Sequence, residues 1–218
     1  MDSNTRVLIV DDHPLVRESL TTLIHQQPDL SVCGEAGSQS EALSAIEQTR
    51  PDLAIIDISL GRGSGLDLIK DIKDRHPALK MLVLSMHDEG VYAERAVRAG
   101  AHGYVMKKES TRKVIDAIRQ VMSGELFLNA EIMASLAKRF VSGRPPIGAL
   151  TVDELSDREL EVFRLLGQGY ETREIAQVLE VSIKTVQTYC ARIKEKLRIR
   201  NGTELLREAV QWSESALR

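Results

Sequence analysis

The 218-residue sequence predicts two domains: a doubly wound α/β domain built on an open parallel sheet, followed by a smaller all-α domain. Short apolar runs alternate with helical patterns over residues 6–123, which indicates parallel βαβ units. Only helical patterns follow the run SGRPPIGA at 142–149, which has no periodicity and whose two prolines cannot continue a helix. We therefore expect domains at 1–124 and 152–218, joined by a linker helix and a flexible linker over 125–151.

Five apolar runs of the first domain have the length and composition of strands. The third, DLAII at 52–56, is almost continuously apolar, as expected of a central strand covered on both faces. The other four are RVLIV at 6–10, LSVCGEA at 30–36, LKMLVL at 79–84 and GYVM at 103–106. A helical pattern follows each run, and the absence of a G-x-G-x-x-G motif argues against a dinucleotide site. Five such units fit a flavodoxin-like sheet.

The helices of the first domain are expected from apolar residues at helical spacing. Pro14 suits the first turn of the first helix, and Gly100 is placed to end the fourth. A further helix is expected over 129–141, with Asn129 as its N-cap. The apolar stripes contain Val16, Leu20 and Leu23; Leu43 and Ile46; Leu66, Ile69 and Ile72; and Val114, Ile118 and Val121.

The second domain is expected to contain four helices. The sequence Ser-Asp-Arg-Glu forms a capping box, with Ser156 as the N-cap and Glu159 at the third helical position. Thr172, Ser182 and Thr203 are expected to cap the next three helices. The helix after Ser182 follows a tight turn and is strongly basic, which indicates a helix-turn-helix whose second helix lies in the major groove of DNA.

Composition and charge describe an ordinary globular protein with one unusual segment. Hydrophobic residues make up 43% and charged residues 28%, and no apolar stretch approaches the ~20 residues of a membrane span. The N-terminus shows no secretion signal, and Cys33 and Cys190 fall in different domains, so we expect unpaired thiols in a reducing cytoplasm. Between Ser182 and Arg200, six positive charges face one negative charge, which favours a polyanionic partner, with a solvated helix face as the alternative.

Reactive side chains stand where four of the expected strands end. Asp11 and Asp12 follow the first strand, Asp57 follows the third, and Ser85 and Lys107 follow the last two. Ligands bind open parallel sheets outside the carboxyl ends of the strands, so these side chains should meet. Three carboxylates repel one another unless a cation lies among them, and oxygen ligands of this kind suit Mg²⁺. A carboxylate beside Mg²⁺ and a lysine is a suitable acceptor for a phosphoryl group.

With these motifs the chain resembles a two-component response regulator of the NarL/FixJ family. The resemblance to its CheY-like receiver domain covers about 6–123 and rests on the ordered set Asp11-Asp12, Asp57, Ser85, Tyr104 and Lys107. The resemblance to a LuxR-type DNA-binding domain covers about 152–214 and rests on LSDRELEVFRLLGQGYETREIAQVLEVSIKTVQTYCARIKEKL.

The resemblance implies a role for each receiver residue. Asp57 would accept a phosphoryl group from a sensor histidine kinase, and Lys107 would pair with the phosphoryl oxygens. Ser85 would turn its hydroxyl toward that group, and Tyr104 would swing inward when Ser85 moves. The ligands of Mg²⁺ would be Asp12, Asp57 and the backbone carbonyl of Ser59, with Asp11 assisting through water.

One receiver position departs from the family pattern. The family usually places a proline four residues after the phosphoacceptor, whereas this chain has Gly61 there. Glycine should make this loop less preorganised, which bears on the rate and lifetime of phosphorylation.

The resemblance also implies DNA contacts on the basic helix. Base reading would fall on Gln187, Thr188 and Ala191. Gln187 stands where many relatives carry lysine, and because glutamine pairs with adenine and lysine with guanine, we expect a preference shifted toward adenine. The full set of expected DNA contacts is Lys184, Thr185, Gln187, Thr188, Ala191, Arg192 and Lys196.

The leading hypothesis is a phosphorylation-controlled transcription regulator that binds promoter DNA as a homodimer, with RNA polymerase as a further candidate partner. The final helix, through Leu205 and Trp212, is the candidate dimer contact, and domain core is the alternative for its apolar stripe. Two other hypotheses stay open. One is a regulator whose receiver works without phosphorylation, and the other is a Mg²⁺-dependent phosphohydrolase with Asp57 as nucleophile.

Overall fold

The computed structural model describes the chain except residues 1–3, 62, 87–88, 135–136, 138–151 and 217–218. The chain divides into two compact units, Met1–Ser142 and Gly143–Arg218, which we call the N-terminal unit and the C-terminal unit. This division falls inside the expected linker, whose flexible part over 142–151 lies outside the described residues. Among the described residues, no helix is both long enough and apolar enough to cross a membrane.

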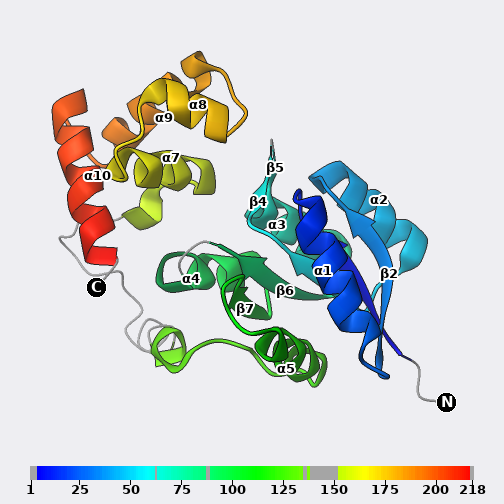
Figure 1. The fold of residues 1–218 in the computed structure, drawn as a ribbon. Coiled ribbons are helices and arrows are strands. Elements are labelled where there is room, and N and C mark those ends of the chain that lie inside the picture. Colours follow the sequence, from blue (N-terminus) through cyan, green and yellow to red (C-terminus); the bar gives the residue numbers. More distant parts are fainter. Residues whose placement is uncertain (1–3, 62, 87–88, 135–136, 138–151, 217–218) are drawn as a thin grey trace. The chain divides into compact units, whose positions relative to one another are not determined.

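The N-terminal unit contains the expected five-stranded parallel sheet, and its doubly wound fold is confirmed (Figure 1). In spatial order the strands are β2 (Leu30–Ala36), β1 (Thr5–Val10), β3 (Leu53–Ile56), β6 (Lys80–Ser85) and β7 (Gly103–Met106). All neighbouring pairs are parallel, and the chain order reverses beside β1. Such a reversal opens a crevice at the carboxyl ends of the strands, where ligands bind.

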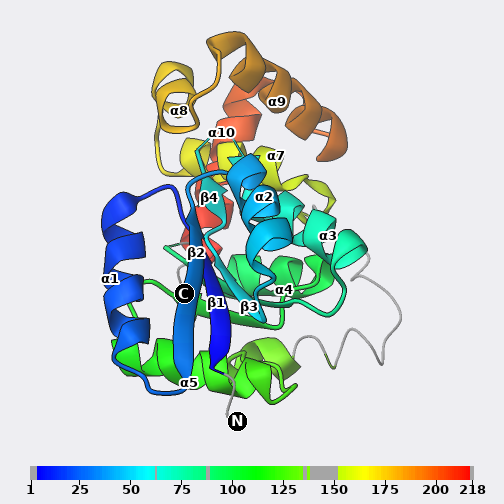
Figure 2. The ribbon, with the colours of Figure 1, turned by 90° about the vertical axis from the view of Figure 1, so that its right-hand side faces the viewer.

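Helices cover both faces of the sheet (Figure 2). The helices are α1 (Pro14–His25), α2 (Gln39–Thr49), α3 (Gly65–Arg75), α4 (Glu89–Ala99) and α5 (Thr111–Met122). Apolar residues of α1 and α5 form one core with alternate residues of the strands, including Val7, Ile9 and Ile55. The remaining strand residues face α2, α3 and α4. Because the central strands are covered twice, all four residues of β3 are buried, as their continuous apolar run predicts.

The segment after α5 pairs with the edge strand β7. The amide of Phe127 donates to the carbonyl of His102 at 3.0 Å, and the amide of Tyr104 donates to the carbonyl of Phe127 at 2.9 Å. A helix follows over the described residues 130–134, and its N-cap is Asn129, whose Oδ1 accepts from the amide of Ile132 at 2.8 Å. The expected cap is therefore present, and the later part of the expected helix lies outside the described residues.

The C-terminal unit is helical, as predicted. A 3₁₀ turn, η1 (Val152–Glu154), precedes α7 (Asp157–Gly167), α8 (Thr172–Val178), α9 (Ile183–Lys196) and α10 (Gly202–Ala216). The helices pack on Leu160, Phe163, Ile175, Val186, Ile193, Leu205 and Ala209, all of which are buried. The tight connection between α8 and α9 gives the expected helix-turn-helix.

Of the four helix caps expected in the C-terminal unit, two are correct and two are wrong. Ser156 forms the capping box of α7, and Ser182 caps α9. For α8 the cap is Glu171 in place of Thr172, because the carboxylate of Glu174 accepts the amide of Glu171 at 2.8 Å. For α10 the side chain of Asn201 accepts the amide of Glu204 at 2.9 Å, so the helix begins before Thr203.

Arg198, in the turn after α9, has a left-handed backbone with φ of 54°. This conformation costs a residue with a Cβ about 1 kcal/mol, and glycine adopts it freely. We expect Arg198→Gly to raise the free energy of unfolding of the C-terminal unit by roughly 0.5–1 kcal/mol. Urea unfolding followed by the fluorescence of Trp212, the only tryptophan of the chain, measures this unit.

The matched control is Arg200→Gly, which removes the same charge from an exposed residue two positions later where the backbone is not left-handed. This control should leave stability unchanged or lower it. An equal gain from both substitutions would show that charge, and not backbone strain, is responsible.

Candidate functional site

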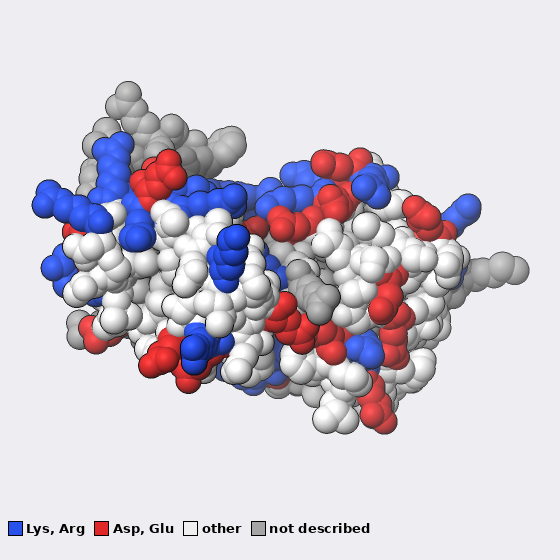
Figure 3. Space-filling model, turned by 90° about the horizontal axis from the view of Figure 1, so that it is seen from above, with Lys and Arg blue, Asp and Glu red and all other residues white. Residues whose placement is uncertain are grey.

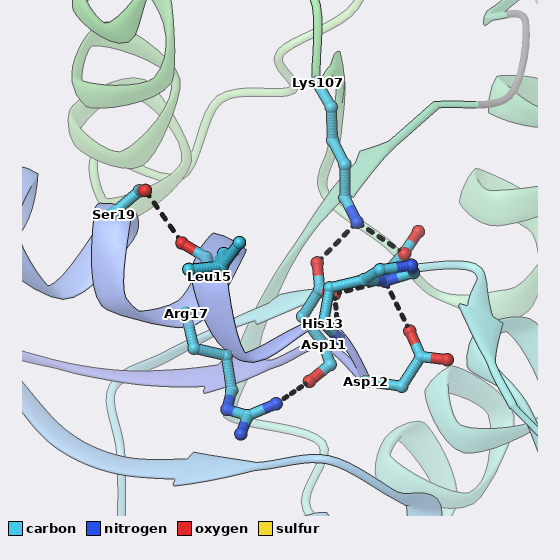
Figure 4. Close-up of polar contacts among 8 residues, drawn as sticks. Asp11, Asp12, His13, Leu15, Arg17, Ser19 and Lys107 are labelled. Atoms are coloured by element: carbon cyan, nitrogen blue, oxygen red, sulfur yellow. Dashed lines mark hydrogen bonds and ion pairs between the residues drawn. The ribbon is translucent and has the colours of Figure 1, made fainter.

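Four adjacent strands bring the polar residues predicted from the sequence to one edge of the sheet. Asp11 follows β1, Asp57 follows β3, Ser85 ends β6 and Lys107 follows β7. Lys107 Nζ lies 2.5 Å from Asp11 Oδ2 and 2.6 Å from Asp57 Oδ2 (Figure 4). The structure therefore brings together three residues that are far apart in the sequence.

Burial and compensating charge set the electrostatics of this acidic site. Asp57 is 4% exposed, and its burial raises the pKa of its carboxyl group above the ordinary value, although the charge and hydrogen bond of Lys107 act in the opposite direction. Burial alone would lower the pKa of Lys107, but the charges and hydrogen bonds of Asp57 and Asp11 outweigh it and raise that pKa. Lys107 is therefore a firmly charged ammonium that compensates two buried acids.

Two carboxylate oxygens of the site are left without a hydrogen-bond donor. Asp57 Oδ1 and Asp12 Oδ1 are buried and accept no hydrogen bond in the described part of the chain, although the exposed ring of His13 contacts Asp12 Oδ1 without hydrogen-bond geometry. Ligand atoms of Asp11, Asp12, His13 and Asp57 lie within 4.8 Å of one another. Buried, unpaired carboxylate oxygens are costly unless a cation approaches them, so these residues fit a hard divalent ion such as Mg²⁺.

His13, which is not among the residues predicted from the sequence, also belongs to this cluster. Its side chain is 64% exposed, as expected of a surface residue, but Nδ1 lies 3.2 Å from Asp11 Oδ1 and 2.8 Å from Asp12 Oδ1. Its backbone amide also donates to Asp11 Oδ1 at 2.9 Å. The signal was its place directly after two acids at a strand end.

Arg17 is a second contributor that the sequence did not reveal. Its Nη1 donates to the backbone carbonyl of Asp11 at 2.6 Å (Figure 4), and its Nε donates to Glu35 on β2 at 3.3 Å. The amide of Asp11 donates in turn to the carbonyl of Ala36 at 3.0 Å. With its carboxylate held by Lys107 and His13, Asp11 is fixed at every polar atom, whereas Asp12 Oδ1 contacts the exposed ring of His13 without a hydrogen bond.

The loop after Asp57 is a small hairpin. Strands β4 (Ser59–Leu60) and β5 (Gly63–Ser64) pair antiparallel, and Gly61 begins their turn with φ of 53°. Proline is fixed near −65° and cannot adopt this angle. Gly61 is expected to make this loop less preorganised. The pairing of β4 with β5 nevertheless holds Ser59, whose carbonyl is an expected metal ligand.

The two expected switch residues are both inside the N-terminal unit. Ser85 is fully buried, and a hydrogen bond from it lowers the pKa of Asp57. Tyr104 is 1% exposed, so its side chain already has the inward position that the resemblance implies for one of two states.

In the C-terminal unit, α9 presents the expected DNA-contacting face. Val186 and Ile193 are buried against the core, and the opposite face is exposed. Thr185 is half-buried, and its hydroxyl lies 2.8 Å from that of the cap residue Ser182. Figure 3 shows lysine and arginine side chains projecting in groups from the surface. The exposed residues of the face are Lys184, Gln187, Thr188, Ala191 and Arg192.

Three other expected contacts have different surroundings. Lys196 Nζ donates to Glu159 at 2.6 Å, so its ammonium is engaged within the unit. Leu205 is buried, and the ring of the half-buried Trp212 lies 5.7 Å from that of the buried Phe163, so both residues pack against the domain core. The core alternative for the stripe of α10 therefore describes these two side chains.

Comparisons with known proteins agree with this division. Residues 7–119 match the family model of the response regulator receiver domain, and residues 153–209 match that of bacterial regulatory proteins of the luxR family. The oxygen regulatory protein NreC of Staphylococcus aureus (strain JH9) is 35% identical over 210 residues, covering 94% of this chain and 97% of NreC.

Solved structures of RcsB are also similar. RcsB from Salmonella enterica serovar Typhimurium, bound to the promoter rprA in the presence of the phosphomimetic BeF₃⁻, is 27% identical with a TM-score of 0.60, covering 94% of this chain and 98% of that one. A structure of two RcsB dimers bound to two parallel DNAs is 26% identical with a TM-score of 0.57, covering 99% and 100%.

Gly65, the first residue of α3, is required by the close approach of that helix to the acidic site. A Cβ at this position would lie 1.9 Å from the carbonyl oxygen of Asp57. We expect Gly65→Ala to lower the free energy of unfolding of the N-terminal unit by about 2–3 kcal/mol, measured by calorimetry. The control is Gly37→Ala, whose Cβ would meet no atom closer than 3.6 Å. Equal effects of the two substitutions would contradict the predicted clash.

Proposed function

The chain belongs to the two-component response regulators that carry a LuxR-type DNA-binding domain, and we propose that Asp57 is the residue through which phosphorylation controls it. As a member of this family it is a phosphorylation-controlled, DNA-binding regulator of transcription. The observation that carries the assignment of Asp57 is its buried carboxylate, held by Lys107 on one oxygen and left without a hydrogen bond on the other.

In the proposed reaction an oxygen of Asp57 forms a bond to phosphorus while the bond to a histidine nitrogen of the sensor kinase breaks. Asp12, Asp57 and the carbonyl of Ser59 would hold Mg²⁺, with Asp11 assisting through water. The bound cation would neutralise negative charge on the transferred group. Lys107 is already charged and within reach of Asp57, so it would pair with the phosphoryl oxygens without further rearrangement.

The phosphoryl group adds nearly two negative charges and three hydrogen-bond acceptors beside Ser85. We propose that Ser85 turns its hydroxyl toward these acceptors and that the inward Tyr104 fills the space behind it. Both side chains are buried, so a change at either must be accommodated by the packed interior around it. Two discrete arrangements of this kind are what a phosphorylation switch requires.

At DNA, the exposed face of α9 would read the major groove with Gln187, Thr188 and Ala191. Lys184, Thr185 and Arg192 would contact phosphates. Binding as a homodimer is supported by the dimers described for RcsB on DNA. On α10, Leu206 and Val210 are 45% and 36% exposed and lie one turn apart, which makes them the candidate dimer contact in place of the buried Leu205. The proposal places the protein in the cytoplasm with RNA polymerase as a further partner.

Asp57→Asn should abolish phosphorylation because the amide nitrogen replaces a nucleophilic carboxylate oxygen. We expect incorporation of phosphate from acetyl phosphate, measured on a phosphate-affinity gel, to fall to background. Removal of Mg²⁺ from the wild type should have the same effect. Asp67→Asn, on the exposed surface of α3, is the matched control and should behave as wild type.

The consequence for DNA binding is measured by selecting genomic fragments with and without Mg²⁺ and beryllofluoride, a mimic of the phosphoryl group. Enrichment of two-fold symmetric sites only with the mimic is the expected result. Equal enrichment in both conditions would support a regulator that binds DNA independently of phosphorylation.

Gln187→Lys should move the base preference at one position of each half-site from adenine toward guanine, since each amide or ammonium pairs with a different base edge. The expected change in relative preference is on the order of tenfold in a binding selection. Gln177→Lys, on the exposed surface of α8, adds the same charge and should strengthen binding without changing the motif. An unchanged motif with Gln187→Lys would contradict base reading by this residue.

A further inference from the structure

Glu159 is a buried charged residue that neither phosphorylation nor DNA reading uses. It is 2% exposed and lies at the third position of α7. The other buried acids in the described part of the chain, Asp11 and Asp57, belong to the acidic site of the N-terminal unit. A buried carboxylate needs compensation, so its partners indicate what it holds in place.

One oxygen of Glu159 joins two helices. Oε2 accepts from the amide of Ser156 at 2.7 Å and from Lys196 Nζ at 2.6 Å. Burial alone would raise the pKa of Glu159, but the bonds from Lys196 and Ser156 outweigh it and lower that pKa, so the carboxylate is charged. Ser156 precedes α7, and Lys196 is the last residue of α9.

The dipoles of both helices stabilise the Glu159–Lys196 ion pair. A carboxylate in the first turn of α7 and an ammonium in the last turn of α9 each complement the dipole of their own helix. Ser182 caps the other end of α9, so the recognition helix is held at both ends. Lys196 follows Arg192 by one helical turn, so the sequence alone places it on the DNA-contacting face. In the structure its ammonium instead donates to Glu159 on α7.

We propose that the Glu159–Lys196 ion pair positions the recognition helix α9 on α7, and that Lys196 is not a phosphate contact. This proposal rests on the proposed DNA reading by α9. Loss of the pair would let the C-terminal end of α9 move against the core while the base-reading residues themselves stay unchanged. Specific binding would then suffer, because it depends on the angle at which the helix enters the groove.

A phosphate contact by Lys196 and a positioning ion pair predict opposite effects of Glu159→Gln on DNA affinity. If Lys196 contacts phosphate, Glu159→Gln frees its ammonium, adds net positive charge and strengthens binding. If the pair positions α9, Glu159→Gln weakens specific binding even though the protein becomes more positive. Lys196→Gln should also weaken it, and Lys196→Arg should restore it, because arginine keeps the charge and can still donate to Glu159.

The experiment measures the affinity of the full chain with beryllofluoride for a duplex enriched from genomic fragments and for a scrambled duplex, over a range of salt concentrations. For Lys196→Gln and Glu159→Gln we expect about tenfold weaker binding to the enriched duplex. Neither should change the slope of log affinity against log salt. Arg192→Gln, the phosphate-contact comparison, should reduce the magnitude of that slope by about 0.9.

Stronger binding by Glu159→Gln, or a slope reduced by about 0.9 in Lys196→Gln, would overturn the proposal. Trp212 fluorescence gives the folded fraction of each variant, and affinities are compared where that fraction equals wild type. If Lys196→Gln does not fold, Glu159→Gln still separates the two roles by the sign of its effect on affinity. Failure of DNA reading itself would appear differently, as equal wild-type affinity for both duplexes and no effect of Arg192→Gln.

Discussion

The ion pairs of Lys107 with Asp11 and Asp57 join the ends of three strands of the parallel sheet. Each carboxylate is buried, and each would be costly there without an opposite charge. One ammonium compensates for two acids, while Asp12 adds a third, so the site carries more acids than ammonium groups and has two carboxylate oxygens that accept no hydrogen bond. The fold thus produces a place where a cation and then a phosphoryl group can change the balance of charge.

In the C-terminal unit, by contrast, the buried carboxylate of Glu159 is fully compensated. Glu159 has one cationic partner and a backbone donor, and together they keep its carboxylate charged. A compensated ion pair between two packed helices holds them in place, whereas a cluster with more acids than ammonium groups can bind a cation. This difference in charge balance distinguishes the acidic site of the N-terminal unit, which can change on ligand binding, from the C-terminal unit, whose helices must keep their arrangement to read DNA.

The sheet and the acidic site could be predicted because they depend on local patterns. A parallel sheet places every strand end at one edge, so Asp11, Asp57, Ser85 and Lys107 are brought together by topology alone. Long-range partners carry no such pattern. Neither Arg17, which reaches back to the carbonyl of Asp11, nor Lys196, which turns to Glu159, has a sequence signal for its acceptor.

Single-residue positions around a helix were harder to predict. The apolar stripe of α10 left a dimer contact and the domain core as alternatives, and the helix packs Leu205 inward while it leaves Leu206 exposed, since neighbouring residues differ by about 100° around the axis. The caps of α8 and α10 likewise lie one or two residues earlier than expected, because Glu174 accepts the amide of Glu171 and the side chain of Asn201 accepts the amide of Glu204.

The pairing of Phe127 with β7 affects how the N-terminal unit can be isolated. An unpaired edge strand presents a row of amides and carbonyls to which another chain can add, and natural proteins cover such edges. Here the backbone of Phe127 satisfies the carbonyl of His102 and the amide of Tyr104. A fragment ending at residue 124 would leave β7 uncovered and open to self-association, so the segment through Asn129 is part of the folded unit and not merely a tether.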